Sequence, residues 1–121
     1  GNGEGGGGGE GGERIRYALG DFREVLPGLL ASGPPEEAMV VACHACGSLT
    51  DTVIDMCVEA KVDFAVMPCC HRDLLTANQM EIVAKSLGCS KQGCIDVARL
   101  GAVIARGFDC RWRTIDASIT P

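Results

Sequence analysis

The sequence has few aromatic residues, no excess of basic charge and no long apolar run. Phe, Trp and Tyr make up 4% of the 121 residues, so a core must consist mainly of aliphatic side chains, Met and Cys. The net charge of −5 provides no positive field, so nucleic acid is not a favoured partner. No apolar run approaches the roughly 20 residues of a membrane span, which argues against a membrane partner. We expect a cytoplasmic protein, with the nucleus or an organelle as alternatives.

Glycine, by contrast, is concentrated at the N-terminus. Nine of the first twelve residues are Gly, a composition typical of a flexible linker. We therefore predict a disordered linker at 1–12 and one folded domain at 13–121. Since 46% of the whole chain is hydrophobic, this domain has enough apolar residues for a single core.

Two continuous apolar runs predict buried strands. Residues 38–43 (AMVVAC) and 64–67 (FAVM) have strand length, and their lack of alternation is typical of a parallel sheet covered on both faces. Apolar and polar residues alternate instead at 14–19 and 108–115. Strands with one solvated face are expected there.

Four other segments have helical periodicity. The first, 22–31, is expected to be short or broken because it contains Pro27 and Gly28. Three further helices are expected at 49–60, 76–88 and 90–107. The order of elements predicts an α/β fold with a partial doubly wound, mostly parallel sheet, in which ligands bind at the carboxyl ends of the strands.

Cysteine and histidine cluster where the two buried strands end. The segment CHACGS (43–48) follows the first of these strands, and PCCHR (68–72) ends the second. If the strands are neighbours in the sheet, side chains from both segments meet at one pocket rim. We predict four of them as catalytic residues: His44, Cys46, Cys70 and His71.

The polar residues of these segments each have two interpretations. An imidazole titrates near neutral pH, so His44 or His71 could remove a proton or position a substrate. Either could equally be a buried, hydrogen-bonded histidine at a strand end. Asp51 is interpreted as closing a capping box that begins at Ser48, with a pocket role as the alternative. Asp96 is interpreted as a charge at a helix start.

Eight cysteines require a choice between core thiols, a metal site and disulfides. We favour reduced thiols in the core or pocket, because several lie in apolar runs. The alternative is a zinc site formed by Cys43 or Cys46 with Cys69, Cys70 and His71. Its spacing is unfavourable, because zinc ligands usually pair two to four residues apart, and adjacent cysteines point opposite ways in an extended chain. No metal site is therefore predicted.

Four segments resemble a known family. HACGSLTD (44–51) and PCCH (68–71) resemble the paired motifs of a methyltransferase-domain family with HxCGxxTD and PCCH sequences, and IDVARLGAVIARGFD (95–109) and IDASITP (115–121) are also similar. That family is similar to eukaryotic methyltransferase-like proteins and, more distantly, to a transfer-RNA 2'-O-methyltransferase family. The resemblance spans residues 15–121.

The resemblance implies a class I methyltransferase fold with S-adenosylmethionine as cofactor. It places the turn at 44–47 beside the transferred methyl group, which makes His44 and Gly47 cofactor-binding residues. It also matches Asp21 and Phe22 to the position that meets the adenine ring, where a carboxylate can accept from the exocyclic amine and an aromatic ring can cover the base. An ordinary turn aspartate before a helix is the alternative for Asp21.

The resemblance covers only the C-terminal half of such a domain. The family fold starts with a strand, a glycine-rich turn and a second strand ending in an acid, and none precedes the strand expected at 14–19. We therefore expect this chain alone to bind S-adenosylmethionine weakly or not at all. The strand at 38–43 would present an unpaired apolar edge, available to another chain. The substrate is not predicted, and the alternative function is a non-catalytic structural, zinc-binding or partner-binding remnant.

Overall fold

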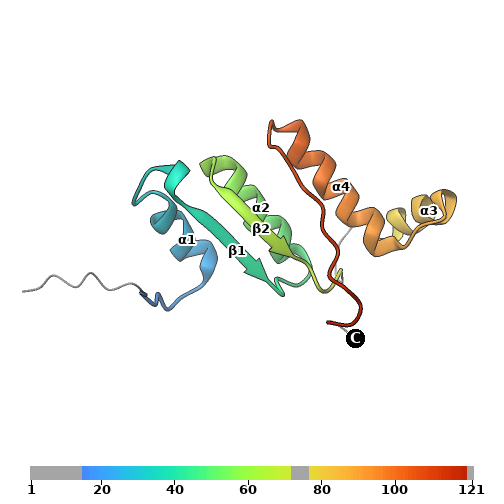
Figure 1. The fold of residues 1–121 in the computed structure, drawn as a ribbon, viewed down its shortest axis with the longest axis horizontal. Helices are drawn as coiled ribbons and strands as arrows, with labels where there is room; N and C mark the ends of the chain where they lie inside the picture. The colour runs from blue at the N-terminus through green and yellow to red at the C-terminus, as the bar shows by residue number, and fades with distance from the viewer. Residues whose placement is uncertain (1–14, 72–76, 120–121) are drawn as a thin grey trace, which may run out of the picture.

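The computed structural model describes residues 15–71 and 77–119, which form four α-helices, a short 3-10 helix and a two-stranded sheet (Figure 1). In chain order the elements are α1 (Phe22–Leu30), η1 (Pro35–Glu37), β1 (Met39–Cys43), α2 (Ser48–Ala60), β2 (Asp63–Met67), α3 (Ala77–Leu87) and α4 (Lys91–Ala105). None of the described helices has the length and apolarity needed to cross a membrane.

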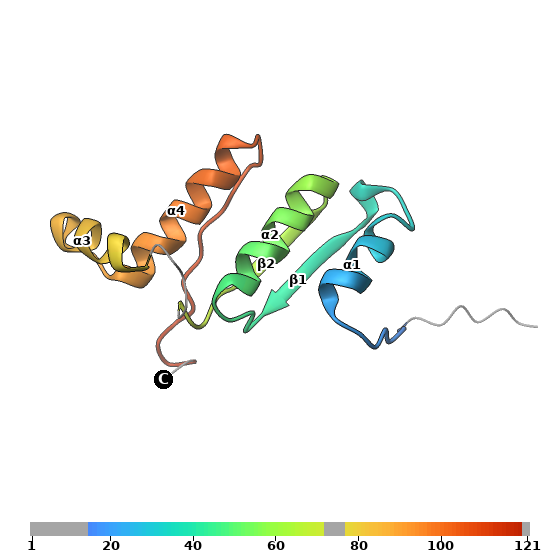
Figure 2. The ribbon, with the colours of Figure 1, turned by 180° about the vertical axis from the view of Figure 1, so that it is seen from behind.

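The centre of the fold is a β-α-β unit. β1 and β2 pair in parallel, from Met39 beside Asp63 to Cys43 beside Met67. α2 connects them and packs on one face of the sheet, as the view from behind shows (Figure 2). The predicted α/β class is confirmed, and the architecture is that of a partial Rossmann-like fold.

The core lies between α2, β2 and α4. Ile54 and Val58 of α2 and Val103 of α4 are each no more than 7% exposed and form one cluster. Phe64 of β2 packs against this cluster together with Phe108, and the centres of the two rings are 5.9 Å apart. The core is therefore mainly aliphatic, as the scarcity of aromatic residues predicted, and two of the few aromatic rings in the chain pack against it.

The other face of the sheet is open. Met39 and Val41 are 62% and 66% exposed, whereas Val40 and Ala42 between them are half-buried. The prediction that both faces of this strand are buried is therefore wrong for the described residues, because α2 covers one face only. In the described part of the chain β1 pairs only with β2. Pairing of its free edge with another chain remains a prediction.

The two alternating segments are not strands. Residues 15–19 and 108–115 have no regular structure, contrary to prediction, because a strand requires ladder hydrogen bonds from a neighbour and no described neighbour supplies them. The alternation at 108–110 still determines which side chains are buried. Phe108 and Cys110 are half-buried against the core, and Asp109 between them is exposed.

The helices begin and end close to the predicted residues. α1 is short and unbroken although Pro27 lies within it, and the Pro27 carbonyl accepts from Ala31 N at 3.0 Å. α4 begins after Ser90, whose hydroxyl accepts from Gly93 N at 3.0 Å. The capping box predicted at Ser48 is wrong, because Ser48 is the first residue of α2 and Gly47 holds the cap position with a φ of 59°.

Candidate functional site

The loops that follow β1 and β2 lie together at the carboxyl edge of the sheet. Their backbones are joined, because His44 N donates to the Met67 carbonyl at 3.2 Å and Gly47 N donates to the Cys70 carbonyl at 2.9 Å. Thr50 is 1% exposed, and its hydroxyl donates to the Ala45 carbonyl, so the first loop is also anchored to α2. The parallel pairing therefore continues past the strands and brings the two predicted segments together.

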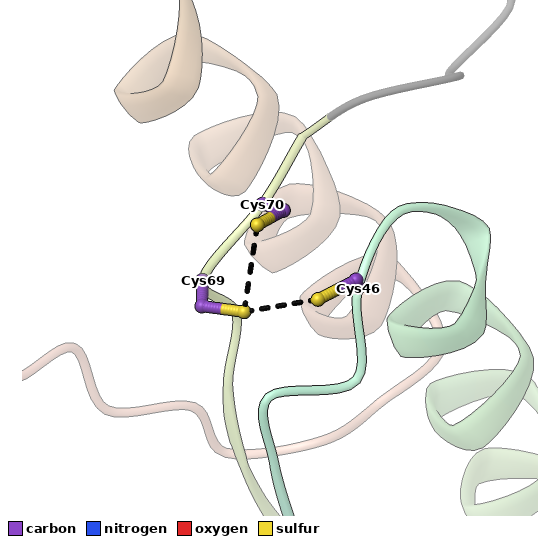
Figure 3. Close-up of side chains that lie close together, drawn as sticks. All are labelled: Cys46, Cys69 and Cys70. Atoms are coloured by element: carbon purple, nitrogen blue, oxygen red, sulfur yellow. Dashed lines mark hydrogen bonds between the residues drawn. The ribbon is translucent and has the colours of Figure 1, made fainter.

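Three thiols from the two loops form one group (Figure 3). The Sγ atoms of Cys46 and Cys69 are 3.1 Å apart, those of Cys69 and Cys70 are 3.8 Å apart, and all three lie within 4.8 Å of one another. We refer to Cys46, Cys69 and Cys70 as the three-thiol cluster. Cys69 and Cys70 do not point opposite ways, as they would in an extended chain, because the strand ends at Met67 and the two residues follow it.

The cluster favours one thiolate. Hydrogen bonds from Cys46 and His44 lower the pKa of Cys69 to about 7. The hydrogen bonds with Cys69 and Cys70 raise the pKa of Cys46 to about 11, because the proton shared with Cys69 stays on Cys46. Since the thiolate is the form that attacks electrophiles and binds metals, Cys69 is the most reactive member of the group at neutral pH.

His44 adjoins this cluster. The residue is exposed and has a φ of 59°, the left-handed conformation that places its side chain at the turn. Its carbonyl accepts from the Cys46 thiol at 3.4 Å, and its imidazole lies close enough to Cys69 to lower the pKa of that thiol. His44 thus adjoins the thiols and remains accessible to an incoming molecule.

His71 faces α4. Its side chain is 7% exposed, and Nε2 lies 2.8 Å from Oδ1 of Asp96. Of the two interpretations made from the sequence, the geometry matches the buried, hydrogen-bonded histidine. Asp96, interpreted as a helix-start charge, lies in the second turn of α4 and bonds both His71 and Arg99.

Arg99 joins the first loop to α4 and was not predicted. Its guanidinium donates to Asp51 at 2.7 and 3.0 Å, to Asp96 at 2.9 Å and to the Gly47 carbonyl at 3.3 Å. Asp51 therefore does not close a capping box. The sequence signal available was the spacing of Asp96 and Arg99, which are three residues apart and so share a helix face. The pairing of Arg99 with Asp51 on α2 has no corresponding signal in the sequence.

Asp21 and Phe22 are placed at the start of α1. In both ribbon views this end of α1 lies at the same end of the molecule as the tips of β1 and β2 (Figures 1 and 2). Asp21 caps the helix by accepting from Arg23 N at 2.9 Å, and its carboxylate pairs with the Arg23 guanidinium at 2.8 Å. These hydrogen bonds lower the pKa of Asp21 to about 2. Asp21 thus occupies the position of an ordinary aspartate before a helix, which was the alternative, and adenine binding stays a prediction.

A groove of about 270 Å³ lies beside this site, between α2 and α4. Asp51 and Arg99 line it together with Ile54 and Ile95, so one side of the groove is the network that holds the first loop. None of the predicted catalytic or cofactor-binding residues lines it. The groove is therefore a neighbour of the thiol edge and not part of it.

Comparison with known proteins decides the family. The sequence profile of a family described as "Methyltransferase domain" matches residues 16–77, which is half of the chain. The chain belongs to this methyltransferase-domain family. The part that matches the methyltransferase domain includes α1, β1, α2 and β2 together with both loops of the site.

The similar curated proteins match this chain over one short segment. Over 31 residues the chain is 55% identical to a glutathione S-transferase C-terminal domain-containing protein of Xenopus laevis and 48% identical to the protein of that name in Homo sapiens. Each match covers 26% of this methyltransferase-domain chain and 5% of the relative. The chain thus matches only a small part of those proteins. No solved structure matches the chain.

Proposed function

We propose that this chain is part of a methyltransferase that uses S-adenosylmethionine, and that the carboxyl edge of its sheet forms the substrate side of the site. The observation that carries the proposal is the family match at 16–77, which contains the two loops that the parallel strands bring together. The methyl acceptor is a protein or small molecule in preference to free nucleic acid, because the chain has a net charge of −5.

Methyl transfer depends mainly on placing the acceptor in line with the methyl group. When bound, S-adenosylmethionine supplies a methyl carbon on a positively charged sulfur. The residues of this edge bind and orient the acceptor, and His44 takes the proton from the acceptor atom that attacks. His44 suits this role because it is exposed and held by the backbone bond to β2. His71 is a positioning residue, since it ties the second loop to Asp96.

The described residues supply part of a cofactor site. The start of α1, which follows Asp21, lies at the end of the fold where the two strands finish (Figure 1), and the turn at 44–47 lies beyond β1. Apart from the turn at 44–47, residues 15–71 and 77–119 contain no turn in which glycine links a strand to a helix. We therefore propose that S-adenosylmethionine binds with useful affinity only when more of the domain is present on the N-terminal side.

Titration calorimetry with S-adenosylmethionine tests this proposal. We expect binding by a chain extended on the N-terminal side and weak or no binding by the 121-residue chain. In the longer chain Asp21→Ser should weaken binding about tenfold, because it removes the proposed adenine contact while Ser keeps the helix cap. Asp63→Ser is the matched control, since Asp63 is exposed at the opposite end of the sheet. Failure of both chains to bind would contradict the proposal and favour a non-catalytic module.

A further inference from the structure

We propose that the three-thiol cluster binds one zinc ion. The starting observation is that Cys46, Cys69 and Cys70 bring their Sγ atoms within 4.8 Å of one another, although two separate loops supply them. This site differs from the zinc site considered from the sequence, because the three-thiol group includes neither Cys43 nor His71. Metal binding at this cluster does not depend on methyl transfer.

The spacing of the sulfur atoms suits a single ion. Zinc binds thiolate sulfur at about 2.3 Å in tetrahedral geometry, so two sulfur ligands of one ion lie about 3.8 Å apart. The separation of 3.8 Å between Cys69 and Cys70 equals this value, and the separation of 3.1 Å between Cys46 and Cys69 needs only a small side-chain rotation. One ion can therefore reach all three sulfur atoms without movement of the backbone.

The backbone holds the two loops in place before any ion arrives. Gly47 N donates to the Cys70 carbonyl at 2.9 Å, which fixes Cys46 and Cys70 relative to each other. Arg99 donates to the Gly47 carbonyl at 3.3 Å and pairs with Asp51, so the first loop is also tied to two helices. A site with its ligands already positioned avoids the entropic cost of ordering the loops when the ion binds.

Three thiolates leave the fourth tetrahedral position of the ion to water, as in zinc sites with three protein ligands. The His44 imidazole is not part of the group of ligand atoms that lie within 4.8 Å of one another. On binding, each thiol releases its proton to water and a sulfur–zinc bond forms, with no change of oxidation state. The ion would tie the loop after β1 to the loop after β2.

The alternative chemistry for close thiols is a disulfide. The structure has eight free cysteines, and one disulfide would use only two of the three thiols in the cluster. Soft thiolate ligands also select zinc over the hard cations magnesium and calcium. Cys43 provides a matched control, because it is an exposed cysteine at the end of β1 that lies outside the cluster.

The test uses the full 121-residue chain, reduced and freed of metal with a chelator, then incubated with zinc chloride and desalted. We expect about one zinc per chain by elemental analysis. Replacing zinc with cobalt(II) should give the thiolate charge-transfer absorption of a tetrahedral site. Cys46→Ser and Cys70→Ser should each lower zinc affinity more than about 100-fold, because the loss of an outer partner of a ligand already costs about 10- to 100-fold. Cys43→Ser should bind as the unchanged chain does.

Three results would overturn the proposal. The first is less than about 0.2 equivalents of zinc on reduced protein whose circular dichroism shows native helix content. The second is full zinc binding by Cys46→Ser or Cys70→Ser. The third is a loss of zinc affinity in Cys43→Ser as large as the loss in Cys46→Ser or Cys70→Ser. Circular dichroism of every variant separates the loss of ligands from a loss of folding.

Discussion

Arg99→Ala is expected to lower the free energy of unfolding by about 2 kcal/mol, because it removes the cation between two carboxylates. The guanidinium is 10% exposed and contacts Asp51 at 2.7 Å and Asp96 at 2.9 Å. A fully buried pair would cost about 3–5 kcal/mol, but Asp51 is 40% exposed, so water screens part of the interaction. Urea unfolding followed by circular dichroism measures the change.

The matched control for this prediction is Arg106→Ala, at the C-cap of the same helix. Arg106 pairs with Asp55 at 3.2 Å, and the two side chains are 47% and 73% exposed. A pair so exposed contributes little, so the variant should unfold within about 0.5 kcal/mol of the unchanged chain. Equal effects of Arg99→Ala and Arg106→Ala would mean that the network between the first loop and α4 does not stabilise the site.

Ile54→Ala is expected to destabilise the chain by about 3 kcal/mol. Ile54 is 7% exposed and packs with Val58 and Val103 at the contact of α2 with α4, so truncation loses buried apolar surface and leaves a cavity. Ile82→Ala on α3 makes the same chemical change at a side chain that is 69% exposed, and it should cost less than about 1 kcal/mol. The same denaturant titration applies, and similar losses in both variants would show that the core is not where the structure places it.

The local elements of this fold could be predicted because their signals are local. The apolar runs at 38–43 and 64–67 became β1 and β2, and the helical stretches became α1 to α4. The alternating segments at 15–19 and 108–115 gave the same local signal as a strand but have no described partner. Strand formation depends on a neighbour, which a single segment cannot reveal.

The site was predictable to the extent that topology determines it. Two parallel strands joined by one helix place their ends at the same edge, which is why Cys46 and Cys70 meet. The inclusion of Cys69 depends on the turn after Pro68, where strand alternation has ended. The pairing of Arg99 with Asp51 spans 48 residues of sequence, and only the packing of α4 on α2 creates it.

The central claim is that the loops after β1 and β2 form one site, and oxidative cross-linking tests it most directly. Metal-free chain is treated with diamide, which oxidises two nearby thiols to a disulfide, and is then digested with trypsin. Because the Sγ atoms of Cys46 and Cys69 are 3.1 Å apart, mass spectrometry should find fragment 24–61 linked to fragment 62–72. The link should disappear in Cys46→Ser and persist in Cys43→Ser. Absence of the link in the unchanged chain, or its persistence in Cys46→Ser, would contradict the account.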